Sequence, residues 1–120
     1  MKAIIRFSVV LLGVVLFAST LRADEPFYDG LGTTAPRITA ANTQAQKYAV
    51  QGMKLLYGFS HGAAIRSFEQ AIKLDPTCAM AYWGIAYANG PHVNFPLVPP
   101  PNAEAAWKNQ IGRASCRERV

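Results

Sequence analysis

The stretch from residue 45 to residue 78 reads AQKYAVQGMKLLYGFSHGAAIRSFEQAIKLDPTC, and it decides the fold. It holds two runs of apolar residues at the spacing of one helix face, separated by the glycine-containing interval 58–62. Asp75-Pro76 ends the second run, because a residue before proline avoids helical backbone angles. The pattern predicts a hairpin of helices at 43–58 and 62–75, which begins with a Thr43–Gln46 capping box. The apolar positions are Tyr48, Gly52, Leu55, Leu56 and Phe59 in the first run and Ala64, Ile65, Phe68, Ala71 and Ile72 in the second.

Two further helices are predicted after this hairpin. The segment 78–89 contains no charged residue, so we expect a helix that is buried on most sides. Residues 90–101 contain five prolines and are predicted to form a proline-rich loop. Asn102 then fits the N-cap of a fourth helix at 102–110, which carries Trp107 on its apolar side. The predicted fold class is all-α.

The spacing in residues 45–78 resembles one ungapped tetratricopeptide repeat, a helical hairpin of about 34 residues. Two positions depart from the family pattern, because Gln51 stands where a leucine is usual and Leu55 where a tyrosine is usual. Residues 79–89 resemble the first helix of a second unit, which extends the repeat-like region to 43–89. The resemblance implies the start of an α-solenoid built from stacked hairpins. The repeat-defining positions are Tyr48, Gly52, Leu55, Ala64, Phe68, Ala71 and Pro76.

The same resemblance implies a function in protein binding, because such solenoids hold peptides on the concave side lined by the first helices. We therefore predict an interaction module for a peptide or protein partner. Two alternatives stay open: neighbouring elements such as the arm 24–42 cover this face, or the chain is the front part of a larger exported enzyme or carrier with its active site downstream. The predicted groove residues are Gln46, Ala49, Met53, Leu56, Met80, Trp83 and Tyr87.

Signatures of catalysis and of cofactor binding are missing from the sequence. No paired carboxylates, phosphate-binding glycine loop or Ser-His-Asp set is visible, so we predict that the chain is not an enzyme. His61 in the predicted turn and His92 in the predicted loop are expected to be solvated, without enough ligands nearby for a metal. Cys78 is expected to be a small buried apolar residue. We predict no cofactor and no metal.

The first 23 residues are typical of a secretory signal peptide. A basic start is followed by the apolar run 7–18 and by a small residue, Ala23, before an acidic segment. We predict cleavage after Ala23, a periplasmic or secreted protein, and an extended N-terminal arm at 24–42. The alternative is an uncleaved signal that anchors the chain, which would be its one link to a membrane; the apolar run is short for a bilayer span.

The net charge of +5 comes from the two ends of the chain. Residues 24–110 carry six basic and six acidic side chains, so no basic patch supports nucleic-acid binding. The last ten residues, IGRASCRERV, hold three arginines behind this neutral body. We predict that 111–120 is a non-native tail and that the chain is a fragment of a longer repeat protein. A genuine basic C-terminus is the alternative.

Overall fold

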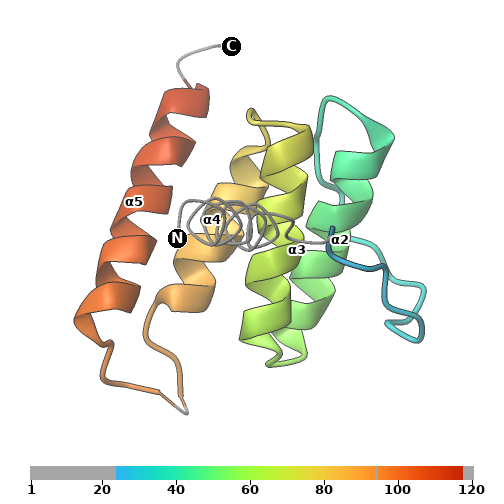
Figure 1. Cartoon of the computed structure of the whole chain (residues 1–120). Helices are drawn as coiled ribbons and strands as arrows, with labels where there is room; N and C mark the ends of the chain where they lie inside the picture. Colours follow the sequence, from blue (N-terminus) through green and yellow to red (C-terminus); the bar gives the residue numbers. More distant parts are fainter. Residues whose placement is uncertain (1–23, 94, 118–120) are drawn as a thin grey trace, which may run out of the picture.

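The computed structural model describes residues 24–93 and 95–117 of the chain. The predicted signal peptide and its cleavage bond lie outside these residues. The described part is all-helical, as predicted: it contains α2 (Thr43–Tyr57), α3 (His61–Leu74), α4 (Ala79–Asn89) and α5 (Pro100–Arg117), and no strand (Figure 1). None of these helices is both long and apolar enough to cross a membrane.

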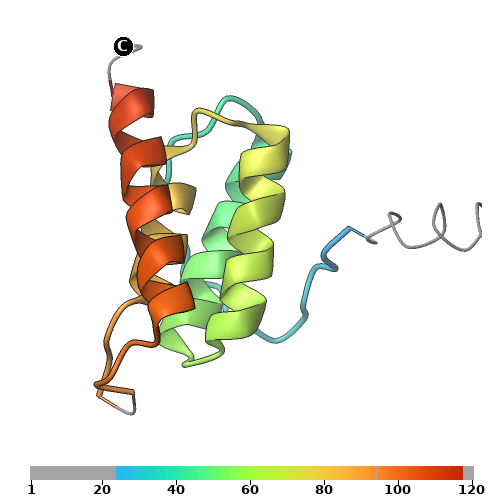
Figure 2. The ribbon, with the colours of Figure 1, turned by 60° about the vertical axis from the view of Figure 1, so that its left-hand side comes forward.

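The four helices lie side by side, and successive helices run in opposite directions (Figures 1 and 2). α2 contacts α3 and α4, α3 contacts α4, and α4 contacts α5. The predicted hairpin is therefore formed by α2 and α3, and a second helical pair follows it. Residues 24–42 form an irregular arm beside α2, without helix or strand.

The start of α2 differs from the predicted capping box. Asn42 is the N-cap, and its side-chain oxygen accepts a hydrogen bond from the backbone N–H of Ala45 at 2.8 Å. Starting the helix from Asn42 leaves Gln46 one position too far along to reach back to the cap. Its side-chain amide instead donates to the carbonyl of Ile38 at 2.7 Å. The Thr43–Gln46 prediction was wrong because asparagine caps at least as well as threonine.

The fourth helix is longer than the predicted 102–110. It begins at Pro100 and continues through Gly112 to Arg117. Prolines are tolerated in a first helical turn, where their missing N–H groups would have no partner within the helix. Asn102, the predicted cap, lies inside this turn and donates its side-chain amide to Asn89 at 3.0 Å. One glycine costs a helix only about 1 kcal/mol, so Gly112 does not end it.

The core is centred on the side chain of Phe68, which is fully buried. Two glycines allow α2 and α4 to reach its ring. A β-carbon built on Gly52 of α2 would lie 2.6 Å from the ring, and one built on Gly84 of α4 would lie 2.3 Å from it. Three helices thus meet on one aromatic side chain. The buried apolar residues of this core are Ile38, Tyr48, Ala49, Met53, Leu55, Leu56, Ala64, Phe68, Ala71, Cys78, Ala81, Ile85 and Ala88.

Candidate functional site

A hollow of about 500 Å³ lies between α2 and α4. It has the size of many ligand pockets, which span roughly 300–1,000 Å³. Its wall is apolar, and methionine and aromatic side chains dominate it. Its lining residues are Met53 and Tyr57 from α2 and Ala79, Met80 and Trp83 from α4.

Helical spacing explains why these side chains meet. Met53 and Tyr57 are four residues apart on α2, and Met80 and Trp83 are three apart on α4, so each pair shares one helix face. Met53 is buried, whereas Tyr57 is 71% exposed and Met80 is 37% exposed. Tyr87 continues the face of α4, with its ring centroid 5.1 Å from that of Trp83. The hollow therefore has a buried floor and an accessible rim.

The seven predicted groove residues divide into two groups. Met53, Met80 and Trp83 line the hollow, and Tyr87 is exposed next to Trp83. Ala49 and Leu56 belong to the core instead, because they pack among the helices. Gln46 is exposed but is bonded to the arm. These three residues therefore do not line the hollow.

Two residues that line the hollow, Tyr57 and Ala79, are not among the predicted groove residues. Tyr57 could have been found, because it follows Met53 by one helical turn and faces the same way. Ala79 carried no such signal, since a single alanine at a helix start is compatible with any environment.

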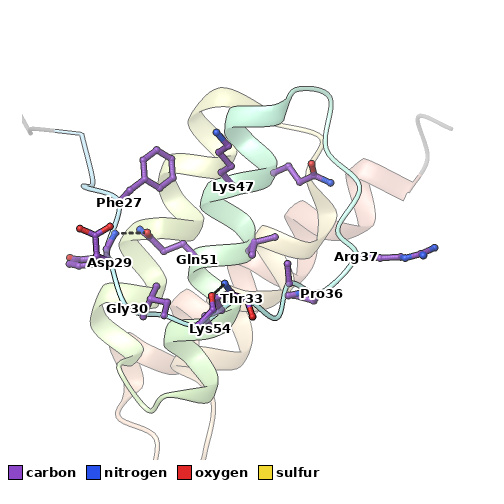
Figure 3. A pocket seen from close by; sticks show the side chains of 15 residues that line it. Phe27, Asp29, Gly30, Thr33, Pro36, Arg37, Lys47, Gln51 and Lys54 are labelled. Carbon is purple, nitrogen blue, oxygen red and sulfur yellow. Dashed lines mark hydrogen bonds between the residues drawn. The ribbon is translucent and has the colours of Figure 1, made fainter.

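A second pocket, of about 830 Å³, lies between the arm and the outer face of α2. The arm bends around the helix, with Phe27 and Asp29 on one side of the pocket and Arg37 on the other (Figure 3). Gly30 and Gly32 have φ values of 79° and 76°, which side chains disfavour, and they allow the bend. The floor is formed by α2, including Val50 and Gln51.

Gln51 fastens the arm to the hairpin. Its side-chain oxygen accepts from the N–H of Tyr28 at 2.9 Å, and its amide nitrogen donates to the carbonyl of Pro26 at 2.9 Å and to the hydroxyl of Ser67 at 3.1 Å. Gln51 is buried, and a buried polar group must be hydrogen-bonded to be tolerated. Gln51 in place of leucine thus has a physical reason: its neighbour is the polar backbone of the arm.

Side chains reinforce the same attachment. The guanidinium of Arg66 donates to the carboxylate of Glu25 at 2.8 Å, and this hydrogen bond raises the pKa of Arg66. The hydroxyl of Tyr28 also donates to Glu25 at 2.8 Å. The ring of Phe27 stacks on Tyr48 with centroids 4.3 Å apart. The arm therefore covers Tyr48 and Gln51, not the hollow between α2 and α4.

The other end of the arm is held by Asp75, at the exit of α3. Its carboxylate accepts from the N–H of Ala41 at 2.6 Å and from the hydroxyl and N–H of Thr77 at 2.6 and 2.9 Å. Burial of Asp75 would raise its pKa, but the hydrogen bonds from Thr77 and Ala41 outweigh burial, and the pKa lies below the ordinary value. The end of α3 thus also anchors the arm.

Within the described residues, no group of three or more histidine, cysteine, aspartate or glutamate side chains is placed to hold a metal ion. Cys78 is buried. The two histidines were expected to be separately solvated, but they contact each other. Their ring centroids are 4.4 Å apart, which brings the α2–α3 turn and the α4–α5 loop together.

Comparison with protein-family models, with curated proteins and with solved structures found no match to this chain. The structure shows an all-helical fold with stacked helical pairs.

Proposed function

We propose that this chain is a tetratricopeptide-type interaction module of an exported protein. In this proposal the hollow between α2 and α4 binds an apolar segment of a partner protein. The observation that carries the proposal is the hollow itself, lined by Met53, Met80 and Trp83 and bordered by the exposed ring of Tyr57. In this proposal the chain binds a partner protein and catalyses no reaction.

The chemistry of the lining favours a protein partner with apolar side chains. Methionine adapts its shape to different ligands, and aromatic side chains supply contact area at a low cost in conformational entropy. No charged residue occurs in α4, and the residues that line the hollow are uncharged. The free-energy cost of leaving water is therefore smaller for an apolar segment than for a charged one.

The arm supports the same assignment. It is fastened to Gln51, Tyr48 and Arg66, on another face of the first hairpin. The hollow consequently remains open although the arm packs against α2. This arrangement argues against the alternative that the arm simply covers the concave face.

A fluorescence titration tests the proposal. The chain contains two tryptophans, so Trp107→Phe leaves Trp83 as the reporter. Twelve-residue peptides selected on the chain by phage display are then titrated. We expect saturable binding with Kd of about 1–100 μM, typical of a small interface, and a change in Trp83 emission.

Matched variants locate the binding. Met80→Glu places a charge at the rim of the hollow and is expected to weaken binding at least about tenfold, since burying an unpaired charge is costly. Leu97, 84% exposed in the α4–α5 loop, gives the control Leu97→Glu, which should leave Kd unchanged. Equal binding by both variants would exclude the hollow as the site.

A second candidate is that the chain forms the N-terminal part of a larger exported enzyme or carrier. Trp107 favours it, because this large side chain is 69% exposed on α5 and offers a packing surface to a further domain. Expressing the complete gene product separates the two candidates. If the second candidate is correct, Trp107 fluorescence in the complete gene product is shifted to the blue relative to this chain, because a downstream domain covers the side chain.

Export is part of the proposal and rests on residues 1–23 alone. We expect a mature N-terminus at Asp24 when the gene is expressed in a bacterium with its own leader. Mass spectrometry of the exported protein measures it. A retained Met1 would favour the anchored alternative.

A further inference from the structure

The two histidines of the chain, 31 residues apart in the sequence, bring two separate segments into contact. His61 is the first residue of α3, and His92 lies in the loop between α4 and α5. Their rings stack face to face, with centroids 4.4 Å apart and an interplanar angle of 13°. No other ring contact recorded for the described residues joins this loop to the α2–α3 turn.

Phenylalanines flank the histidine pair on both sides. The ring of Phe59 meets His61 edge to face at 6.3 Å, and the ring of Phe95 stacks on His92 at 5.9 Å. Phe59 has a φ of 60°, a left-handed conformation that phenylalanine rarely adopts. His92 and Phe95 exchange two backbone hydrogen bonds, of 3.2 and 2.8 Å. The four rings thus form one row, and each end is fixed by the backbone.

The surroundings of the two histidine rings favour the neutral form of an imidazole over the protonated form. Burial lowers the pKa of His61, and the charge of His92 lowers it further, while a hydrogen bond with the Phe59 backbone opposes them. The positive end of the α3 dipole also disfavours a cation at His61. Nδ1 of His92 is buried and has no hydrogen-bond partner in the described part of the chain. An imidazolium carries a proton on both nitrogens, so that atom would become a buried donor without an acceptor.

Within the described residues, neither histidine forms a salt bridge with a carboxylate. Of the charged side chains on the adjoining elements, Lys54 of α2 is bonded to the carbonyl of Gly32 and Arg66 of α3 to Glu25. Helix α4 has none. The remaining titratable groups on the described parts of these elements are not among the causes of the lowered pKa of His61; they are Lys47, Tyr48, Tyr57, Glu69, Lys73, Tyr82, Tyr87, Glu104 and Lys108.

We propose that the His61–His92 stack is an acid-sensitive latch, which holds the α4–α5 loop on the α2–α3 turn when both rings are neutral and opens when both are protonated. The first proton meets the cost of burial, which attraction to the phenylalanine and imidazole faces partly offsets. The second creates like charges in contact. The folded pKa of His61 lies below the unfolded value of 6.5, so the latch contributes stability above that pH and loses it as the pH falls. This inference does not depend on the proposed binding function.

Proton NMR of the chain tests the latch directly. The sequence contains two histidines, so two imidazole signals are assigned with His61→Phe and His92→Phe. We expect the second proton to bind at least about tenfold more weakly than the first, as in coupled sites. A nuclear Overhauser effect between the two rings should be present at about pH 7.5 and lost below about pH 5, past the histidine range.

His92→Phe is the decisive variant, because it keeps an aromatic ring in the stack and removes the charge. Its contact with His61 should persist at about pH 5, while far-UV circular dichroism of the wild type stays unchanged over the same range. Two results would overturn the latch. One is an unchanged ring contact in the wild type after both histidines have titrated. The other is loss of the contact at the same pH in His92→Phe. The wild-type titration decides the question even when a variant fails to fold.

Discussion

The contact of Phe68 with two glycines makes a sharp prediction about the substitution Gly84→Ala. In an exposed helix, replacing glycine by alanine stabilises by about 1 kcal/mol. Here the new β-carbon would lie 2.3 Å from two carbons of the Phe68 ring. Ordinary van der Waals contact begins at 3.4 Å, so ring and helix must separate by a further 1.1 Å. The ring is fully buried and is also blocked on its other side by Gly52.

The magnitude follows from these two opposing effects. Forcing extra methyl groups into a packed core typically costs about 1–3 kcal/mol, and the severe overlap at Gly84 places this site at the upper end. Subtracting the helix-propensity gain of about 1 kcal/mol leaves a net destabilisation of about 2 kcal/mol. Gly62→Ala is the control, because a β-carbon there meets only the end of the Arg66 side chain, at 3.9 Å. It should be neutral or stabilising.

Urea unfolding followed by circular dichroism measures both variants. A double-mutant cycle with Phe68→Leu then isolates the contact. The smaller side chain destabilises the wild type but relieves the overlap, so Gly84→Ala should cost markedly less in the Phe68→Leu background. A Gly84→Ala variant as stable as Gly62→Ala would refute the packing argument. So would strict additivity in the cycle.

Two further predictions concern the arm. Gln51→Leu restores the residue usual in the resembled repeat, yet we expect it to destabilise the chain by about 1–3 kcal/mol, because the Tyr28 N–H loses its acceptor; limited proteolysis should then cut within 24–42, and an arm that resists cleavage would contradict this. Asp75→Asn should abolish an acid transition that we expect in the wild type. The pKa of Asp75 is depressed, so its stabilisation is complete above the unfolded value of 3.8 and is lost as the pH falls through the folded value; equal acid sensitivity of the two proteins would contradict this assignment.

Much of the fold follows from local patterns in the sequence. The helical spacing in residues 43–89 predicts α2, α3 and α4 to within one residue at each end, because their apolar faces repeat at the helical period. Phe68 stands four residues after Ala64 on this face, which predicts its burial. The boundary of α5 was missed because prolines both end helices and begin them. The sequence before Asn102 does not distinguish these two roles.

The contacts of the arm were not predictable in the same way. Residues 24–42 have no periodicity, so nothing local shows which face they cover. Gln51 was recognised as a departure from the repeat pattern, but its hydrogen-bond partners lie 23 and 25 residues away, at Tyr28 and Pro26. The histidine stack escaped prediction for a similar reason. It joins a turn to a loop whose path depends on how α4 and α5 pack.

The arm also explains how the first hairpin meets water on its outer side. In the proposed repeat fold each hairpin covers the face of its neighbour, and a hairpin face without such a neighbour needs a polar cover. Several contacts of the arm are polar on both partners: the Gln51 amide binds the backbone at Tyr28 and Pro26, and the Arg66 guanidinium binds Glu25. A leucine at position 51 would leave those backbone groups unsatisfied. Gln51 departs from the leucine that is usual in the resembled repeat because the polar backbone of the arm requires an amide there. The arm leaves the hollow between α2 and α4 uncovered.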